Sequence, residues 1–161
     1  MLRNVLGVIG GYIAMFIAVF VTFTALYLAI GADRAFKPES FEPSMLWTVA
    51  SIVVSIAAAV IGGLVCGLIS KSRGAVISLA VVVVVLGLAM AIPALFGVAP
   101  ADLGPRSGDL SNLEAMQQAR PPVWTLIVNP IIGAVGAIIG GFMVTKPKVG
   151  GGSAVDAPPA A

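Results

Sequence analysis

The sequence consists of four long apolar segments separated by shorter polar ones. These segments cover residues 5–31, 45–70, 75–96 and 123–145, and none of them contains a charged side chain. A helix needs about 20 apolar residues to cross the hydrocarbon core of a bilayer. Lipid offers no hydrogen-bonding partner to the backbone, so segments of this kind must be helical. The pattern therefore predicts an all-α membrane protein, a four-transmembrane-helix bundle within residues 1–148.

The composition agrees with this prediction and limits the kinds of partner, cofactor and reaction that the protein could have. Of the 161 residues, 59% are hydrophobic and 10% charged, whereas a soluble domain has about a quarter charged residues. The net charge of +2 comes from scattered residues, which argues against a nucleic-acid partner. The chain has no His and only Cys66, so the usual zinc, haem and iron–sulfur ligand sets cannot be assembled. We expect no cofactor, no metal, no catalytic residue and no enzymatic activity.

The distribution of Lys and Arg predicts the orientation in the membrane. Positive residues dominate the cytoplasmic side of membrane proteins. One side of the predicted bundle carries almost only positive residues, and the other mixes both signs. The basic residues of the first side are Arg3, Lys71, Arg73, Lys146 and Lys148. This side is expected to be cytoplasmic, with both termini on it, a turn in which Gly74 takes a positive φ, and a disordered tail at 149–161. The richness in Gly, Ala and Val is typical of a bacterial inner membrane protein.

The first connection on the other side, residues 32–44, contains two prolines and two phenylalanines. We expect it to be irregular, with Phe36 and Phe41 inserted into the membrane interface. Trp47 and Trp124 begin the second and fourth segments, where tryptophan commonly anchors a helix at the interface.

The second connection on this side is longer and predicts a short amphipathic helix. Ser111–Glu114 has the S-x-x-E pattern of a capping box, in which the two side chains bond backbone donors of the first turn. Leu110, Leu113 and Met116 follow at three-residue spacing and form an apolar stripe. This stripe either packs on the bundle itself or is a docking surface for a partner.

Glycines recur in the segments at positions suited to close helix packing. Small residues let helix backbones approach one another where no hydrophobic effect drives association. The candidate packing residues are Gly10, Gly11, Gly62, Gly63, Gly67, Gly133, Gly136, Gly140 and Gly141. They predict that the first, second and fourth segments touch closely, while the third, with its bulky row Val81–Val85, is more exposed to lipid. Packing within the chain and homo-oligomer formation both remain open.

The three Gly-Gly pairs also indicate a partial internal repeat of two helical hairpins. Trp-Thr begins the second and the fourth segments, and a Gly-Gly pair follows in each. The third segment has no such pair, so chance similarity between apolar segments is an alternative interpretation.

The absence of charge within the spans limits the possible transport mechanisms. A proton-coupled exporter of the small multidrug type needs a carboxylate in its first helix, and none occurs between Arg3 and Asp33. The remaining polar candidates are neutral. They form a possible polar site in the outer half of the spans, made of Asn129, Thr22, Thr24, Ser51 and Ser55. Hydrogen bonding between helices, or to their own backbone, is the alternative role for these groups.

The stretches 111–117, 122–124 and 129–133 resemble those of small four-helix bacterial inner-membrane proteins. That resemblance implies a fold but no activity. We expect a non-enzymatic membrane protein that acts through helix–helix association, as an accessory or scaffold subunit that self-associates or binds a larger complex. The alternative is a small channel or transporter for a neutral solute that uses Asn129 and the Ser and Thr groups of the helices.

Overall fold

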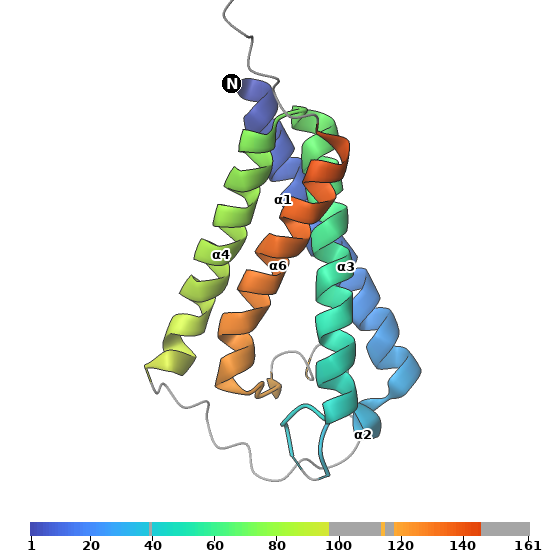
Figure 1. The fold of residues 1–161 in the computed structure, drawn as a ribbon. Helices are drawn as coiled ribbons and strands as arrows, with labels where there is room; N and C mark the ends of the chain where they lie inside the picture. The colour runs from blue at the N-terminus through green and yellow to red at the C-terminus, as the bar shows by residue number, and fades with distance from the viewer. Residues whose placement is uncertain (39, 97–113, 115–117, 146–161) are drawn as a thin grey trace, which may run out of the picture.

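The computed structural model describes residues 1–38, 40–96, 114 and 118–145, and Figure 1 shows their arrangement. The helices are α1 (Leu2–Ile30), α2 (Ala32–Ala35), α3 (Met45–Ser70), α4 (Arg73–Leu95) and α6 (Val123–Val144). All except α2 are long and apolar enough to cross a membrane. The all-helical prediction and the four apolar spans are thus confirmed, with bounds that differ from the expected ones by three residues at most.

The turn between α3 and α4 differs from the expected one. The prediction of a positive φ at Gly74 is wrong, because Gly74 lies within the first turn of α4. Lys71 instead has the left-handed backbone (φ 53°, ψ 28°), and its N–H donates to Gly67 O at 2.8 Å. Only residues 71 and 72 separate the two helices, so the chain must reverse at the residue that directly follows α3.

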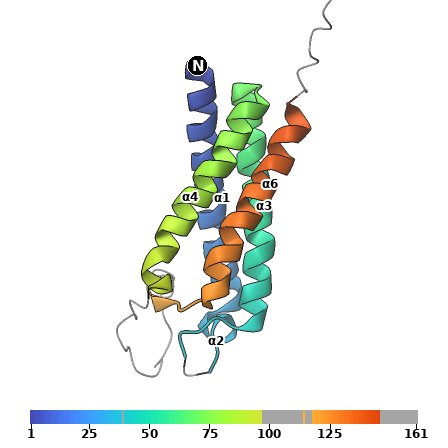
Figure 2. The same ribbon diagram turned by 60° about the vertical axis from the view of Figure 1, so that its left-hand side comes forward.

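The four long helices form a bundle in which α6 lies between α3 and α4. Figure 1 shows this order, Figure 2 shows α6 crossing in front of α3, and the main contacts join α1 with α3, α3 with α6, and α4 with α6. Although α3 and α4 are consecutive in the sequence, they diverge from their short turn. The expectation that the first and fourth segments touch closely is wrong: α1 and α6 pack on different sides of α3 rather than on each other.

The expectation that the third segment is the most exposed span is also wrong. Val76, Leu79 and Ala80 of α4 are buried, since α4 packs along α6. The least covered span is α1, with 11% of its most apolar window buried, compared with 28 to 39% in the other three.

The two ends of the bundle differ in their connections. We call the end that holds Arg3, the turn 71–72 and Thr145 the basic end, and the opposite end, with residues 31–44, the loop end. At the loop end the connection contains α2 and an isolated bridge between Phe36 and Pro43, and its other described residues are irregular, as expected. Ser44 fixes the end of this connection, because its backbone N–H donates to Ala35 O at 2.8 Å.

The two phenylalanines of the loop end are buried in the protein, contrary to the expected insertion into the membrane interface. Phe36 and Phe41 are 5% and 7% exposed. Trp47 is half-buried, with its ring edge-on to those of Phe23 and Tyr27 at centroid distances of 5.7 and 6.0 Å. Trp124 is 51% exposed, and its role as an interfacial anchor stays a prediction. The bonding of Phe36 and Ser44 folds this connection back onto the helix ends, where its aromatic side chains find apolar neighbours.

Several predictions fall outside the described residues. They concern the short amphipathic helix, with Leu110, Leu113 and Met116, and the tail at 149–161.

Candidate functional site

The glycine pair of α3 lies at the centre of the packing. A Cβ atom on Gly62 would lie 2.8 Å from Gly11 O and from Met15 Cβ of α1, whereas one on Gly63 would overlap the backbone carbonyl of Ala137 in α6. Successive residues of an α-helix point about 100° apart. Two adjacent glycines therefore let α3 make backbone-level contact with two different helices.

The contact of α1 with α3 uses glycines four residues apart. A Cβ atom on Gly11 would lie 2.7 Å from Gly62 O, and one on Gly7 would lie 2.7 Å from Ser70 Cβ. Gly10 differs, because a Cβ there would meet only the end of the flexible Ile69 side chain. Gly7 and Gly11 are four residues apart, a spacing that places both on one face of the helix.

The glycines of α6 face two helices in the same way. A Cβ on Gly140 would overlap Val60 O of α3, and one on Gly136 would lie 2.8 Å from Ala59 Cβ. Gly141 faces Val76 of α4.

Three further glycines complete the seams between helices. Gly67 of α3 faces Gly141 O of α6, while Gly133 of α6 lies near Val83 of α4. Gly87 of α4 was not among the candidates; a Cβ there would lie 2.5 Å from Pro130 Cγ. No sequence spacing pointed to Gly87, because its partner is a proline on another helix.

The contacts of the two pairs do not follow the suggested repeat. Gly62 faces α1, the other helix of its own hairpin, but its counterpart Gly140 faces α3 rather than α4. Likewise Gly63 faces α6, whereas its counterpart Gly141 faces α4. Gly63 and Gly140 instead make reciprocal contacts, with the backbone carbonyls of Ala137 and Val60, so the suggested duplication stays a prediction.

The five residues of the possible polar site are not gathered at one point. Thr22 and Thr24 belong to α1 and Asn129 to α6, and these two helices do not pack on each other. Ser51 Oγ donates to Thr48 O of its own helix at 2.8 Å. Thr24, Ser55 and Asn129 are half-buried and Thr22 is exposed. The described residues thus hold Asn129 apart from the hydroxyl groups of α1.

Two arginines at the basic end bind the carboxyl ends of helices. Arg3 Nε donates to Ile69 O at 2.7 Å, near the end of α3. Arg73 Nε donates to Thr145 O at 3.4 Å, just after α6, and its guanidinium lies 4.6 Å from the centre of the Phe142 ring. Carbonyl groups at a helix C-terminus carry partial negative charge, which a cation offsets. These two side chains therefore stabilise the positions of α3 and α6.

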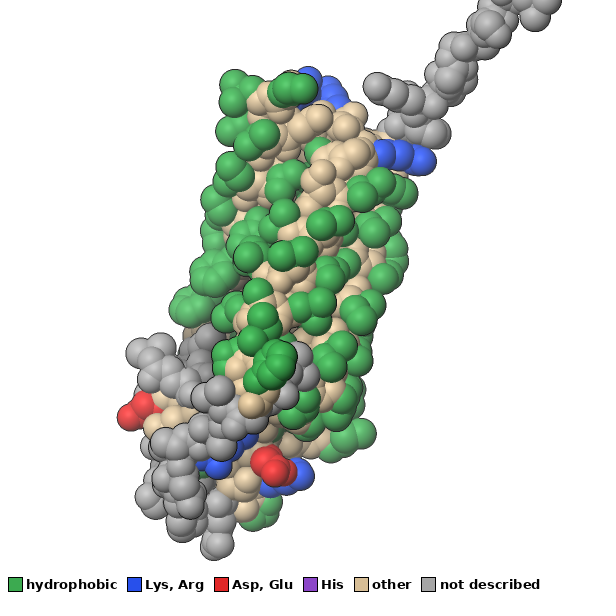
Figure 3. All heavy atoms as spheres, turned by 90° about the vertical axis from the view of Figure 1, so that its left-hand side faces the viewer, with side chains coloured by type: hydrophobic (Ala, Val, Ile, Leu, Met, Phe, Trp, Pro, Cys, Tyr) green, Lys and Arg blue, Asp and Glu red, His purple; other side chains and the backbone are tan. Residues whose placement is uncertain are grey.

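Figure 3 shows how charge is distributed over one face of the molecule. Hydrophobic side chains cover the middle, Lys and Arg lie near one end, and acidic and basic side chains both occur near the other. Among the described residues, the carboxylates are those of Asp33, Glu42 and Glu114, all in segments that connect helices at the loop end. The described part of the basic end therefore has cations without carboxylates.

Two grooves open at the basic end. The first lies between the ends of α3 and α6, has a volume of about 340 Å³, and is lined by Gly67, Leu68, Lys71, Val144 and Thr145. We call it the α3–α6 groove.

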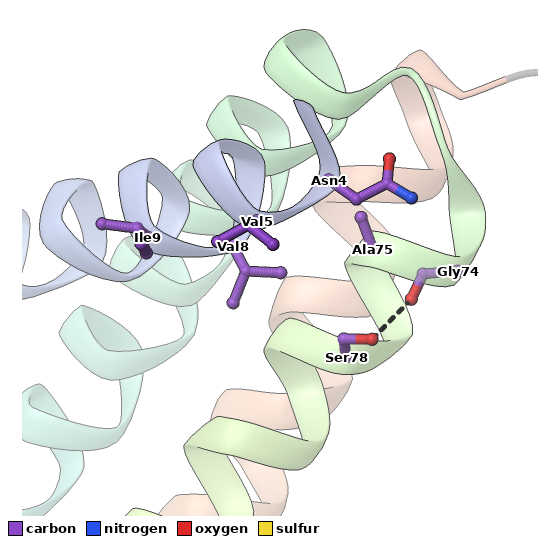
Figure 4. A pocket seen from close by; sticks show the side chains of 7 residues that line it. All are labelled: Asn4, Val5, Val8, Ile9, Gly74, Ala75 and Ser78. Atoms are coloured by element: carbon purple, nitrogen blue, oxygen red, sulfur yellow. Dashed lines mark hydrogen bonds between the residues drawn. The ribbon is translucent and has the colours of Figure 1, made fainter. Parts of the chain in front are cut away.

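The second groove, of about 260 Å³, separates the first turns of α1 and α4. Figure 4 shows the Asn4 amide at its rim, the apolar side chains of Val5, Val8 and Ala75 along it, and Ser78 bonded to its own helix at Gly74. Its lining has no charged side chain.

Within the described ranges, no cluster of three or more His, Cys, Asp or Glu side chains could hold a metal ion. The geometry present is that of close helix packing, with a cationic rim at one end. Comparisons with protein-family models, curated proteins and solved structures find no match for this chain.

Proposed function

We propose that this protein is a non-enzymatic integral membrane protein of a bacterial inner membrane, acting as an accessory or scaffold subunit through helix–helix association. Both termini are cytoplasmic in this proposal, so the basic end faces the cytoplasm. The proposal concerns an association surface rather than a reaction centre.

The observation that carries it is the wide uncovered face of α1. Of its 29 residues only Gly7, Gly11 and Tyr27 are buried. Ile13, Phe16, Ile17 and Phe20 are about half exposed, over two successive turns. The glycine seam holds α1 firmly against α3, so this face is presented on a rigid element. Aromatic and branched side chains on a fixed helix suit packing against another transmembrane helix.

The test is isolation of the full chain from its native host in a mild detergent, followed by native mass spectrometry. The expected result is a stoichiometric complex that is weakened by Ile13→Ala. Ile77→Ala in α4 is the matched control, because Ile13 and Ile77 are 51% and 49% exposed. A monomer, or a complex equally sensitive to both substitutions, would contradict the proposal. Solute flux that depends on Asn129 would instead support the channel or transporter alternative.

The orientation has its own test in intact cells. In a Cys66→Ala background, Ser40→Cys at the loop end should react with a membrane-impermeant maleimide, whereas Ser72→Cys should react only after permeabilisation. The reverse labelling pattern would place the basic end outside.

A further inference from the structure

We propose that the α3–α6 groove binds an anionic phospholipid of the adjacent leaflet, with its phosphate at Lys71 and an acyl chain along Leu68 and Val144. The inference rests on the membrane placement in the proposed function but not on the presence of a protein partner.

The charges around the groove favour an anionic group. Lys71 lines the groove and is exposed. Arg73 adds a second positive charge at this end of the bundle, where its side chain contacts Thr145 O and the Phe142 ring. Cationic pockets between helices at a cytoplasmic boundary are suited to acidic lipid head groups.

The shape of the groove suits a lipid rather than a free anion. Gly67 lines the groove, and a Cβ there would lie 2.6 Å from Val144 Cγ2, so α3 and α6 pack closely where the groove begins. Leu68 is 59% exposed and Val144 36% exposed. These two side chains form an apolar wall beside Lys71. A lipid can therefore place its phosphate at the lysine and pack an acyl chain against this wall. The backbone carbonyls at the end of α3 would repel an isolated anion, but Arg3 at Ile69 O offsets part of this charge.

The α1–α4 groove of Figure 4 is the natural comparison. It has similar apolar walls but only a neutral amide at its rim. With no charged side chain in its lining, this groove is expected to distinguish anionic from zwitterionic lipids less strongly than the groove that contains Lys71.

The test is native mass spectrometry of the purified full chain, incubated with equimolar phosphatidylglycerol and phosphatidylcholine of identical acyl chains. Wild-type protein should retain phosphatidylglycerol preferentially. Lys71→Gln should lower that preference about fivefold, the factor expected for one cation near the membrane surface. Lys71→Arg should restore it. Arg34→Gln, which removes an exposed charge at the loop end, should leave it unchanged.

Three outcomes would overturn the inference. Equal retention of the two lipids by wild-type protein would show that the groove does not select charge, and equal loss in Lys71→Gln and Arg34→Gln would show a long-range charge effect. Soluble glycerol phosphate is added as a competitor, and displacement of the lipid by it at millimolar concentration would indicate an anion site without lipid recognition. Because Lys71 is exposed, all variants should keep the wild-type circular dichroism spectrum and melting temperature.

Discussion

The basic end and the loop end of the bundle are held together in different ways. At the basic end the helix backbones lie so close together that a side chain would not fit between them at Gly11, Gly63 and Gly140. The largest side chains that are fully buried, Cys66, Val76 and Leu79, surround these seams. At the loop end an aromatic cluster with Tyr27 and Phe36, together with bonds from Ser44, performs the same task.

This difference follows from the part of the chain that each set of contacts joins: the glycine seams lie within the apolar spans, whereas the aromatic cluster includes Ala32, Ala35 and Phe36 of the connection outside them. Within lipid, moving an apolar side chain from one apolar neighbour to another yields little free energy, so helices gain stability by close backbone approach. At the boundary with water, burying aromatic rings is favourable and backbone groups outside helices need partners. The seams should therefore be sensitive to added volume, and the loop end to removed side chains.

The largest loss of stability is expected for Gly63→Ala. Its Cβ would overlap the backbone carbonyl of Ala137, so α3 and α6 must move apart, at a cost of roughly 2 to 3 kcal/mol. Gly74→Ala is the matched control: there the nearest atom is Ser72 Oγ at 3.6 Å, and alanine favours helix. Unfolding by sodium dodecyl sulfate in mixed micelles measures both changes. If Gly63→Ala were as stable as Gly74→Ala, the seam would not hold the bundle together.

The second largest loss of stability is expected at the loop end, for Trp47→Ala. Loss of the edge-on contacts with Phe23 and Tyr27 should destabilise the protein by about 2 kcal/mol. Trp124→Ala removes the same side chain from a position that is 51% exposed and should cost well under half as much. Thermal melting in detergent compares the two variants. Equal losses would mean that both tryptophans act only as interfacial anchors.

The sequence was sufficient to predict the spans but not their partners. The bounds of α3 were obtained correctly, because polar Ser44 and Lys71 delimit a long uncharged run. The position of α6 between α3 and α4 was not predictable, since these helices are apolar on all faces and periodicity does not identify an inward side. For the same reason the pair at residues 62–63 indicated close packing without showing that each glycine faces a different helix.

The candidate site at the basic end could also be predicted only in part. The cations of the basic end were identified from charge alone, yet the groove beside Lys71 depends on how the ends of α3 and α6 meet. Burial of Phe36 and Phe41 also escaped sequence reasoning, because it depends on a bridge and hydrogen bonds that fold the connection back onto the bundle.

A smaller effect is expected for Ser44→Ala. Ser44 Oγ accepts from Trp47 N at 3.1 Å, which caps α3, and donates to Arg34 O at 2.6 Å. Loss of a serine cap costs about 1 kcal/mol. Ser72 occupies the same position before α4 but makes no capping bond with its side chain, so Ser72→Ala should change stability by only a few tenths of a kcal/mol. Chemical denaturation in micelles distinguishes them, and a larger loss from Ser72→Ala would reverse the assignment of the two caps.

The smallest effect concerns pH and the ion pair at the tip of the loop end. Lys37 Nζ donates to Glu42 Oε2 at 2.6 Å, and this hydrogen bond and the lysine charge lower the pKa of the Glu42 carboxyl from its ordinary value. Because the folded-state pKa is the lower one, the pair stabilises the fold above the ordinary carboxyl pKa. That contribution is lost as the pH falls through the lowered value. Both side chains are more than half exposed, so solvent screens the pair and the change in melting temperature should be slight. Titration of the Glu42 carboxyl carbon by NMR gives the sharper measurement: Lys37→Met should raise the pKa of Glu42 towards its ordinary value. An unchanged pKa in that variant would show that the pair does not persist in solution, and would leave Ser44 and the aromatic cluster as the interactions that order the loop end.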